Sequence, residues 1–206
     1  MSTPAEPGAP HLQPTTWARL IDSIDAANVF VLVRSWLGPR ARLEVAVEDV
    51  WQETLWMAWR DRQQHEWVNL TKYRAWLLAI ARNRVHEAVR SLGRIKRGGR
   101  VRTSSLSALG HGETLAGYLP PQSTTPSRVA SNVERARQFE LALEQLDPPL
   151  REIVRLRLFE ELSAQEAATQ LGIPLSTAKE RFVRGTQRYR DALQRLLGSD
   201  DSQVDA

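Results

Sequence analysis

Apolar residues recur at steps of three and four along most of this 206-residue chain, and no convincing run alternates between apolar and polar residues. Steps of three to four place side chains on one face of an α-helix, whereas a half-buried strand requires alternation. The longest apolar runs, such as residues 29–33, are far shorter than the ~20 residues that span a bilayer. The pattern predicts an all-α protein without membrane insertion.

Two periodic parts of the chain are separated by a stretch with no period. Residues 96–131 are rich in Ser, Thr, Gly and Pro, and they exceed the length of an ordinary loop inside a domain. We therefore expect two helical bundles joined by a flexible linker. The predicted segments are a disordered arm (1–15), a first helical domain (16–95), the linker (96–131), a second helical domain (132–198) and an acidic tail (199–206).

Helix ends are predicted from the periodic segments together with capping residues, prolines and glycines. The expected helices run from Trp17 to Gly38, from about Val47, from about Tyr73 to Leu92, from Asn132, from Asp147, from Ser163, and from Ser176 to about Leu197. Ser163 and Glu166 have the spacing of a capping box. In this motif, the side chain of each residue accepts a hydrogen bond from the backbone N–H of the other at the start of a helix.

Positive charge is concentrated in one stretch. The whole chain has a formal net charge of only +4, but residues 72–102 hold ten basic residues and one acidic residue. A local cationic block suits a polyanion, because each neutralised phosphate releases condensed counterions. A solvated basic helix followed by a basic linker is the alternative interpretation.

Signals of catalysis and of metal binding are missing. The chain has no cysteine, its four histidines are scattered, and no glycine-rich phosphate loop or hydrolase motif occurs. We therefore predict a protein that is not an enzyme and that has no metal site and no cofactor. The N-terminus lacks the basic and apolar regions of a secretory signal, so we expect a cytoplasmic protein.

Residues 163–184 read SAQEAATQLGIPLSTAKERFVR, two short helices that meet at Gly172. A small residue at Ala168 and a glycine at the turn are typical of a helix-turn-helix, whose second helix lies in the major groove of DNA. Arginine and lysine can bond guanine, and a carboxylate such as Glu180 can accept from cytosine N4. The candidate DNA-contacting residues are Ser176, Thr177, Lys179, Glu180, Arg181, Arg184 and Arg188.

Two stretches together resemble a known family. The runs Glu48–Leu55, Ala58–Arg60 and Tyr73–Asn83 are similar to region 2 of bacterial σ70-type sigma factors, above all the extracytoplasmic-function (ECF) class. The runs Leu143–Val154 and Gly172–Lys179 are similar to region 4. The resemblance covers about 150 residues in the family's order.

The resemblance implies a promoter-selecting subunit of RNA polymerase. Region 2 would bind core RNA polymerase and open the −10 element, region 4 would bind the −35 element of promoter DNA, and an anti-sigma factor would hold the protein inactive. The positions that match the family's polymerase-binding surface are Asp49, Gln52, Glu53, Trp56 and Trp59.

Strand opening requires a cationic surface with aromatic rings on which unpaired bases stack. Such residues occur between positions 67 and 90, and the candidates for −10 DNA binding are Trp67, Lys72, Tyr73, Trp76, Arg82, Asn83, Arg84 and Arg90. Asn83 offers both a donor and an acceptor to a base edge. Trp76 also fits the apolar stripe of its helix and Tyr73 fits either role, so both can instead be core residues.

Two residues depart from the family pattern in the second domain. Ala167 and Ala178 stand where a larger branched residue is usual, which predicts looser or altered packing of the helix-turn-helix. Two other functions are kept open. The chain could be a stand-alone helix-turn-helix regulator, or a decoy that binds an anti-sigma factor without reading DNA.

Overall fold

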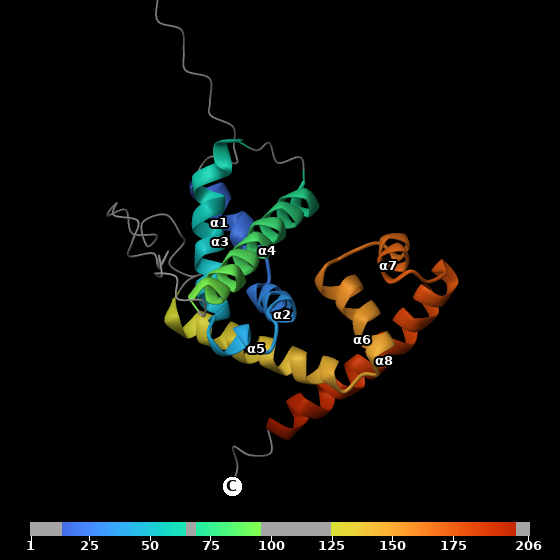
Figure 1. The fold of residues 1–206 in the computed structure, drawn as a ribbon. Helices are drawn as coiled ribbons and strands as arrows, with labels where there is room; N and C mark the ends of the chain where they lie inside the picture. Colours follow the sequence, from blue (N-terminus) through green and yellow to red (C-terminus); the bar gives the residue numbers. More distant parts are fainter. Residues whose placement is uncertain (1–13, 65–68, 96–124, 201–206) are drawn as a thin grey trace, which may run out of the picture. The chain divides into compact units, whose positions relative to one another are not determined.

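The computed structural model describes residues 14–64, 69–95 and 125–200, and every regular element within these ranges is helical (Figure 1). The all-α prediction is therefore confirmed for the described residues. The chain divides into two compact units, residues 1–131 and residues 132–206, here called the N-terminal unit and the C-terminal unit. Most of the expected arm, linker and acidic tail lies outside the described residues.

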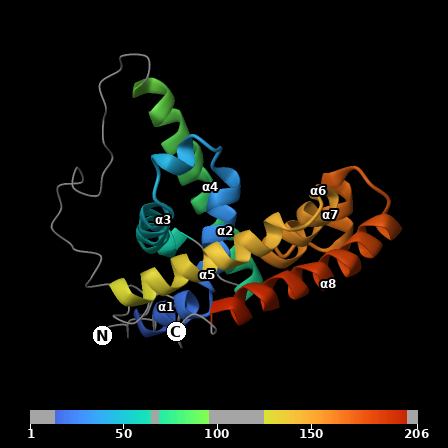
Figure 2. The same cartoon turned by 90° about the horizontal axis from the view of Figure 1, so that it is seen from below.

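In its described residues the N-terminal unit includes the helices α1 (Pro14–Asp22), α2 (Ala26–Trp36), α3 (Val47–Asp61) and α4 (Leu70–Ile95), with short 3-10 turns at Ala41–Leu43 and Arg62–Gln64. Six consecutive or near-consecutive apolar residues of α2 are buried, so this helix is covered on most sides. It packs against both α3 and α4, which also pack against each other. Figure 2 looks nearly along α3 and shows α2 and α4 beside it.

The expected single helix from Trp17 to Gly38 is wrong, because the chain breaks into α1 and α2. Asp25 is the N-cap of α2, and its carboxylate accepts a hydrogen bond of 3.0 Å from the backbone N–H of Ala27. This bond satisfies one of the amide groups that have no partner inside the first turn of a helix. The break lets Trp17 fold back onto the unit, where its indole is fully buried.

The C-terminal unit is built from α6 (Pro148–Val154), a π-helical turn (Arg155–Phe159), α7 (Ala164–Leu171) and α8 (Leu175–Asp200), together with most of α5 (Pro126–Glu144). α6 and α7 both pack against α8. The predicted start of α5 at Asn132 is wrong. Pro126 occupies the first helical position, where its missing N–H costs nothing and its fixed φ suits a helix.

Arg151 of α6 holds the carboxyl end of α5. Its guanidinium donates hydrogen bonds to the backbone carbonyls of Leu143, Glu144 and Leu146, at 3.0–3.1 Å. The last carbonyls of a helix have no partner within it, and a cation there also suits the negative end of the helix dipole. This contact fixes the turn between α5 and α6.

Candidate nucleic-acid interface

α7, the turn after it and the start of α8 form the predicted helix-turn-helix. Gly172 has φ +62°, in the left-handed region that favours glycine, and its N–H bonds to the carbonyls of Ala168 and Thr169. Ala167, Ala168 and Ala178 are all buried between the helices. The two alanines that depart from the family pattern therefore form part of a close contact rather than an exposed gap.

The capping box at the start of α7 is confirmed. Ser163 Oγ accepts from the backbone N–H of Glu166, and a carboxylate oxygen of Glu166 accepts from the backbone N–H of Ser163 at 2.7 Å. These hydrogen bonds to Ser163 lower the pKa of the exposed Glu166 carboxyl below its ordinary value. The predicted start of the last helix at Ser176, as its capping residue, is wrong. α8 begins at Leu175, and the N–H of Ala178 bonds to the carbonyl of Pro174.

We expect Ser163→Ala to lower the free energy of unfolding of the C-terminal unit by about 1 kcal/mol, because the backbone N–H of Glu166 loses its acceptor. The pKa of Glu166 should rise in the variant. Since that pKa is depressed in the folded state, its stabilising effect is present above the unfolded pKa and is lost as pH falls through the folded value. Denaturant unfolding and carboxyl NMR titration measure both effects.

Ser176→Ala is the control, because it removes no cap and should leave stability unchanged. Equal losses of stability in the two variants would contradict the assignment of Ser163 as the cap.

The first turns of α8 present an exposed polar face. Ser176, Lys179, Glu180 and Arg184 are exposed, whereas Thr177 and Arg181 are half-buried at its edge. Arg184 and Glu180 form a pair at 3.5 Å in which both side chains are largely exposed. An exposed pair of this kind is weak, so both groups remain able to contact a ligand.

Val183 lies in the middle of this face and was missed from the sequence. At 100° per residue, Lys179, Glu180 and Gln187 each point within about 60° of the direction of Val183. Val183 is 69% exposed, although its apolar neighbours on the helix, such as Ala178, are buried. Val183 is an apolar residue among polar ones on this face, so it does not follow the apolar spacing of the helix. That departure from the spacing is the sequence signal that identifies Val183.

Arg188 is not a free cation. Its guanidinium lies 2.5 Å from the carboxylate of Asp147, which precedes α6, and both side chains are more than half exposed. This pair ties α8 to the start of α6, and a phosphate would have to compete with Asp147 for Arg188.

α4 carries the predicted −10 residues, and the structure divides them. Lys72, Arg82, Asn83 and Arg90 are exposed. The Arg82 guanidinium also lies 5.9 Å from the centre of the Trp36 ring. Trp67 lies outside the described residues. The exposed members combine cations with one amide, which suits a phosphate backbone and a base edge.

Tyr73, one of the predicted DNA-contacting residues, is fully buried. Its ring centre lies 5.8 Å from that of Trp17, in an edge-to-face arrangement. Burial also raises the pKa of its hydroxyl. The ring centre of Trp76 lies 6.1 Å from that of Tyr73, and Trp76 is half-buried. Of the two alternatives left open for Tyr73, its burial favours the core.

Arg84 is also a poor phosphate ligand in this structure. Its side chain is only 16% exposed and lies between the carboxylates of Glu53, at 3.6 Å, and Glu87. The first of these pairs joins α4 to α3. Burial raises the pKa of Glu53, while the attraction of Arg84 opposes that rise. Arg84 therefore takes part in the packing of α3 on α4, and its contact with DNA stays a prediction.

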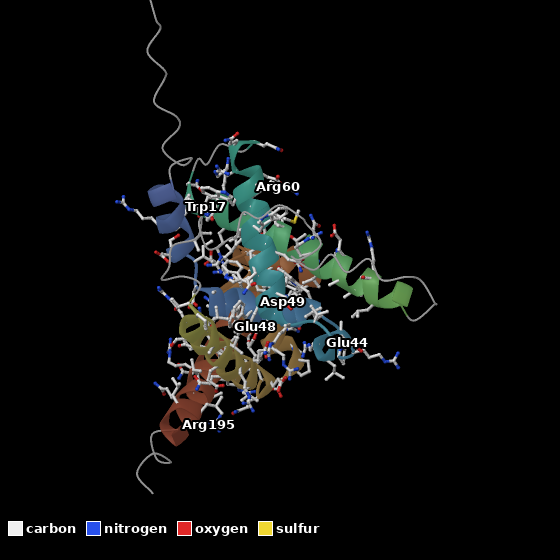
Figure 3. All side chains as sticks on the ribbon, turned by 90° about the vertical axis from the view of Figure 1, so that its left-hand side faces the viewer. Trp17, Glu44, Glu48, Asp49, Arg60 and Arg195 are labelled. Atoms are coloured by element: carbon white, nitrogen blue, oxygen red, sulfur yellow. The ribbon has the colours of Figure 1, made fainter. Side chains whose placement is uncertain are left out.

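The predicted polymerase-facing residues lie along α3. Figure 3 shows Asp49 and Glu48 near one end of this helix and Arg60 near the other. Asp49 and Gln52 are exposed, and Glu53, Trp56 and Trp59 are half-exposed. Trp59 packs edge-on against Trp17 at 5.6 Å, with the Arg62 guanidinium 3.5 Å from its ring centre. Gln52, Trp56 and Trp59 share one face at helical spacing, so carboxylates flank a partly exposed aromatic surface.

Within the ranges that the structure describes, no group of three or more His, Asp or Glu side chains is placed to hold a metal ion. The helices there are also too short or too polar to cross a lipid bilayer.

Comparisons with known proteins agree with the resemblance of the chain to sigma factors. Residues 136–188, which include α6, α7 and the start of α8, match the family "Sigma-70, region 4". The chain is 32% identical over 151 residues to the ECF RNA polymerase sigma factor SigL of Mycobacterium tuberculosis, covering 72% of this chain and 75% of SigL. It is 29% identical over 146 residues to the ECF RNA polymerase sigma factor SigE of Mycolicibacterium smegmatis. That second match covers 71% of this chain and only 51% of SigE. Neither unit is as long as these matches, so the similarity includes residues of both units.

Proposed function

The chain belongs to the family of ECF RNA polymerase sigma factors, and we propose that it binds core RNA polymerase and directs it to promoters. The observation that supports this most strongly is the exposed polar face at the start of α8, in the segment that matches sigma region 4. A helix after a tight turn, with Lys179, Glu180 and Arg184 free to reach outward, has the chemistry needed to read base edges in the major groove.

The two units would act on different DNA structures. In the proposal, α8 binds the intact −35 duplex, and the exposed residues Lys72, Arg82, Asn83 and Arg90 of α4 hold the opened −10 strand. In the same proposal the half-buried Trp76 supports one base, and Tyr73 stabilises the helix from the core. The protein itself does no chemistry, because its role is to supply binding energy and promoter choice to the polymerase. We further propose a cytoplasmic location and control by an anti-sigma factor.

The proposal is tested by adding the purified chain to core RNA polymerase with a genomic promoter library and sequencing the transcripts. We expect new start sites that share upstream and downstream elements. Duplex binding without polymerase and without new transcripts would indicate a stand-alone regulator. Polymerase or anti-sigma binding without any DNA selectivity would indicate a decoy.

Core association should depend on the aromatic face of α3. We expect the double variant Gln52→Ala, Trp56→Ala to weaken binding to core polymerase by about 30-fold or more, because truncating an aromatic anchor of an interface typically costs ~2 kcal/mol. Co-purification and titration with labelled core polymerase measure the loss. Gln64→Ala is the matched control, since Gln64 is an exposed glutamine of the same unit outside the α3 face. Unchanged core binding in the double variant would refute the assignment of this face.

A further inference from the structure

Val183 is an apolar side chain in a place where burial does not explain it. It is 69% exposed, whereas Ala178, Tyr189 and Ala192 of the same helix are buried. Valine is also a weaker helix former than most residues, because its branched Cβ restricts χ1. An exposed helix surface alone would favour a long polar residue at this position.

The surroundings of Val183 favour a small apolar ligand group. Lys179 and Glu180 lie one turn before it on the same face, and Arg184 follows it directly. The preceding residue, Phe182, is half-buried, and the Arg157 guanidinium lies 4.9 Å from its ring centre. One valine surrounded by charged groups offers too little apolar area for a protein partner, whose contacts need an extended desolvated core.

The major groove of DNA offers one small apolar group, the 5-methyl of thymine. All other base-edge features there are donors or acceptors, and apolar side chains are the usual contacts of that methyl. We propose that Val183 recognises a thymine methyl group in the −35 duplex, an inference that rests on the proposed function. Lys179 and Arg184 are suited to guanine and Glu180 to cytosine, so the thymine belongs to an element that also contains G·C pairs.

The test uses the full-length chain and duplexes that differ by single methyl groups. A randomised duplex library is first selected with the chain, alone and with core polymerase. Each thymine of the selected −35 site is then replaced by uracil, which removes only the methyl. We expect the wild-type chain to bind one substituted duplex ~4-fold more weakly, as for the loss of one buried methyl group. Val183→Ala should bind that duplex and its thymine parent equally well.

Leu197→Ala is the matched control, since Leu197 is also an exposed aliphatic residue of α8 but lies three turns or more beyond the polar face. It should keep the full preference for thymine. The proposal is overturned if no thymine shows a methyl effect, or if Val183→Ala retains the effect of the wild type. It is equally overturned if the variant loses core-polymerase association, which would make Val183 a protein contact. Failure of the selection to enrich any duplex would instead overturn the proposed function.

Discussion

Replacing both Lys179 and Arg184 by alanine is expected to reduce transcription from −35-dependent promoters by at least about 30-fold. Each side chain is exposed on the polar face of α8, and loss of one base or phosphate contact typically costs ~1–3 kcal/mol. The exposed pair between Arg184 and Glu180 contributes little to folding, so the variant should remain folded. Promoter titration measures the loss, and the slope of log affinity against log salt should fall by up to about 2.

The matched control for this prediction removes two cations elsewhere. Arg128 and Arg137 are exposed residues of α5, and their replacement by alanine changes the net charge by the same amount. We expect this control to transcribe within about twofold of the wild type. Core association should be equal in all three proteins. A similar loss of transcription in both double variants would mean that overall charge, and not the start of α8, determines promoter binding.

Local interactions explain why several elements could be predicted from the sequence. The capping box of Ser163 and Glu166 and the left-handed turn at Gly172 depend on residues within five positions of each other. The start of α3 near Val47 likewise follows from its apolar spacing and from the acidic residues in its first turn. Two further helix starts have equally local signals. Pro126 lies at the start of α5 but falls in the predicted linker, and Asp25 caps α2 but falls inside the helix predicted from Trp17 to Gly38.

The role of Tyr73 could not be predicted because it depends on contacts that are distant in sequence. Its position on α4 is equally compatible with the core and with a stacking surface, as the helical period alone shows. Trp17, 56 positions earlier, lies against it only because α1 and α2 separate at Asp25. The same reason applies to Arg84, whose partner Glu53 is on α3. A periodic pattern identifies a face of a helix, but the neighbouring helices decide which part of that face is buried.

Gly185 is a second residue whose role depends on a distant neighbour. A glycine in the middle of a helix is unfavourable by about 1 kcal/mol relative to alanine, so sequence alone gives no reason for it in α8. In the structure it is buried where α6 crosses α8. A Cβ atom added there would lie 2.7 Å from Val154 Cγ2 and 3.2 Å from the carbonyl oxygen of Leu150. The absence of a side chain lets the two helices approach.

We therefore expect Gly185→Val to lower the free energy of unfolding of the C-terminal unit by about 3 kcal/mol. Val154 is fully buried and stiff at χ1, and the Leu150 carbonyl is backbone, so neither can move aside cheaply. Because α8 also carries the polar face, DNA binding should fall together with stability. Unfolding followed by far-UV circular dichroism measures the change.

The positions of the tryptophans provide an internal control for this variant. All seven tryptophans lie between residues 17 and 76, so their fluorescence reports unfolding of the N-terminal unit alone and should not change. Gly198→Val, in the last turns of the same helix, places its Cβ where no atom lies within 4 Å and should be neutral within about 0.5 kcal/mol. If Gly185→Val were as stable as Gly198→Val, α6 and α8 could not be in the close contact that positions the start of α8 for DNA.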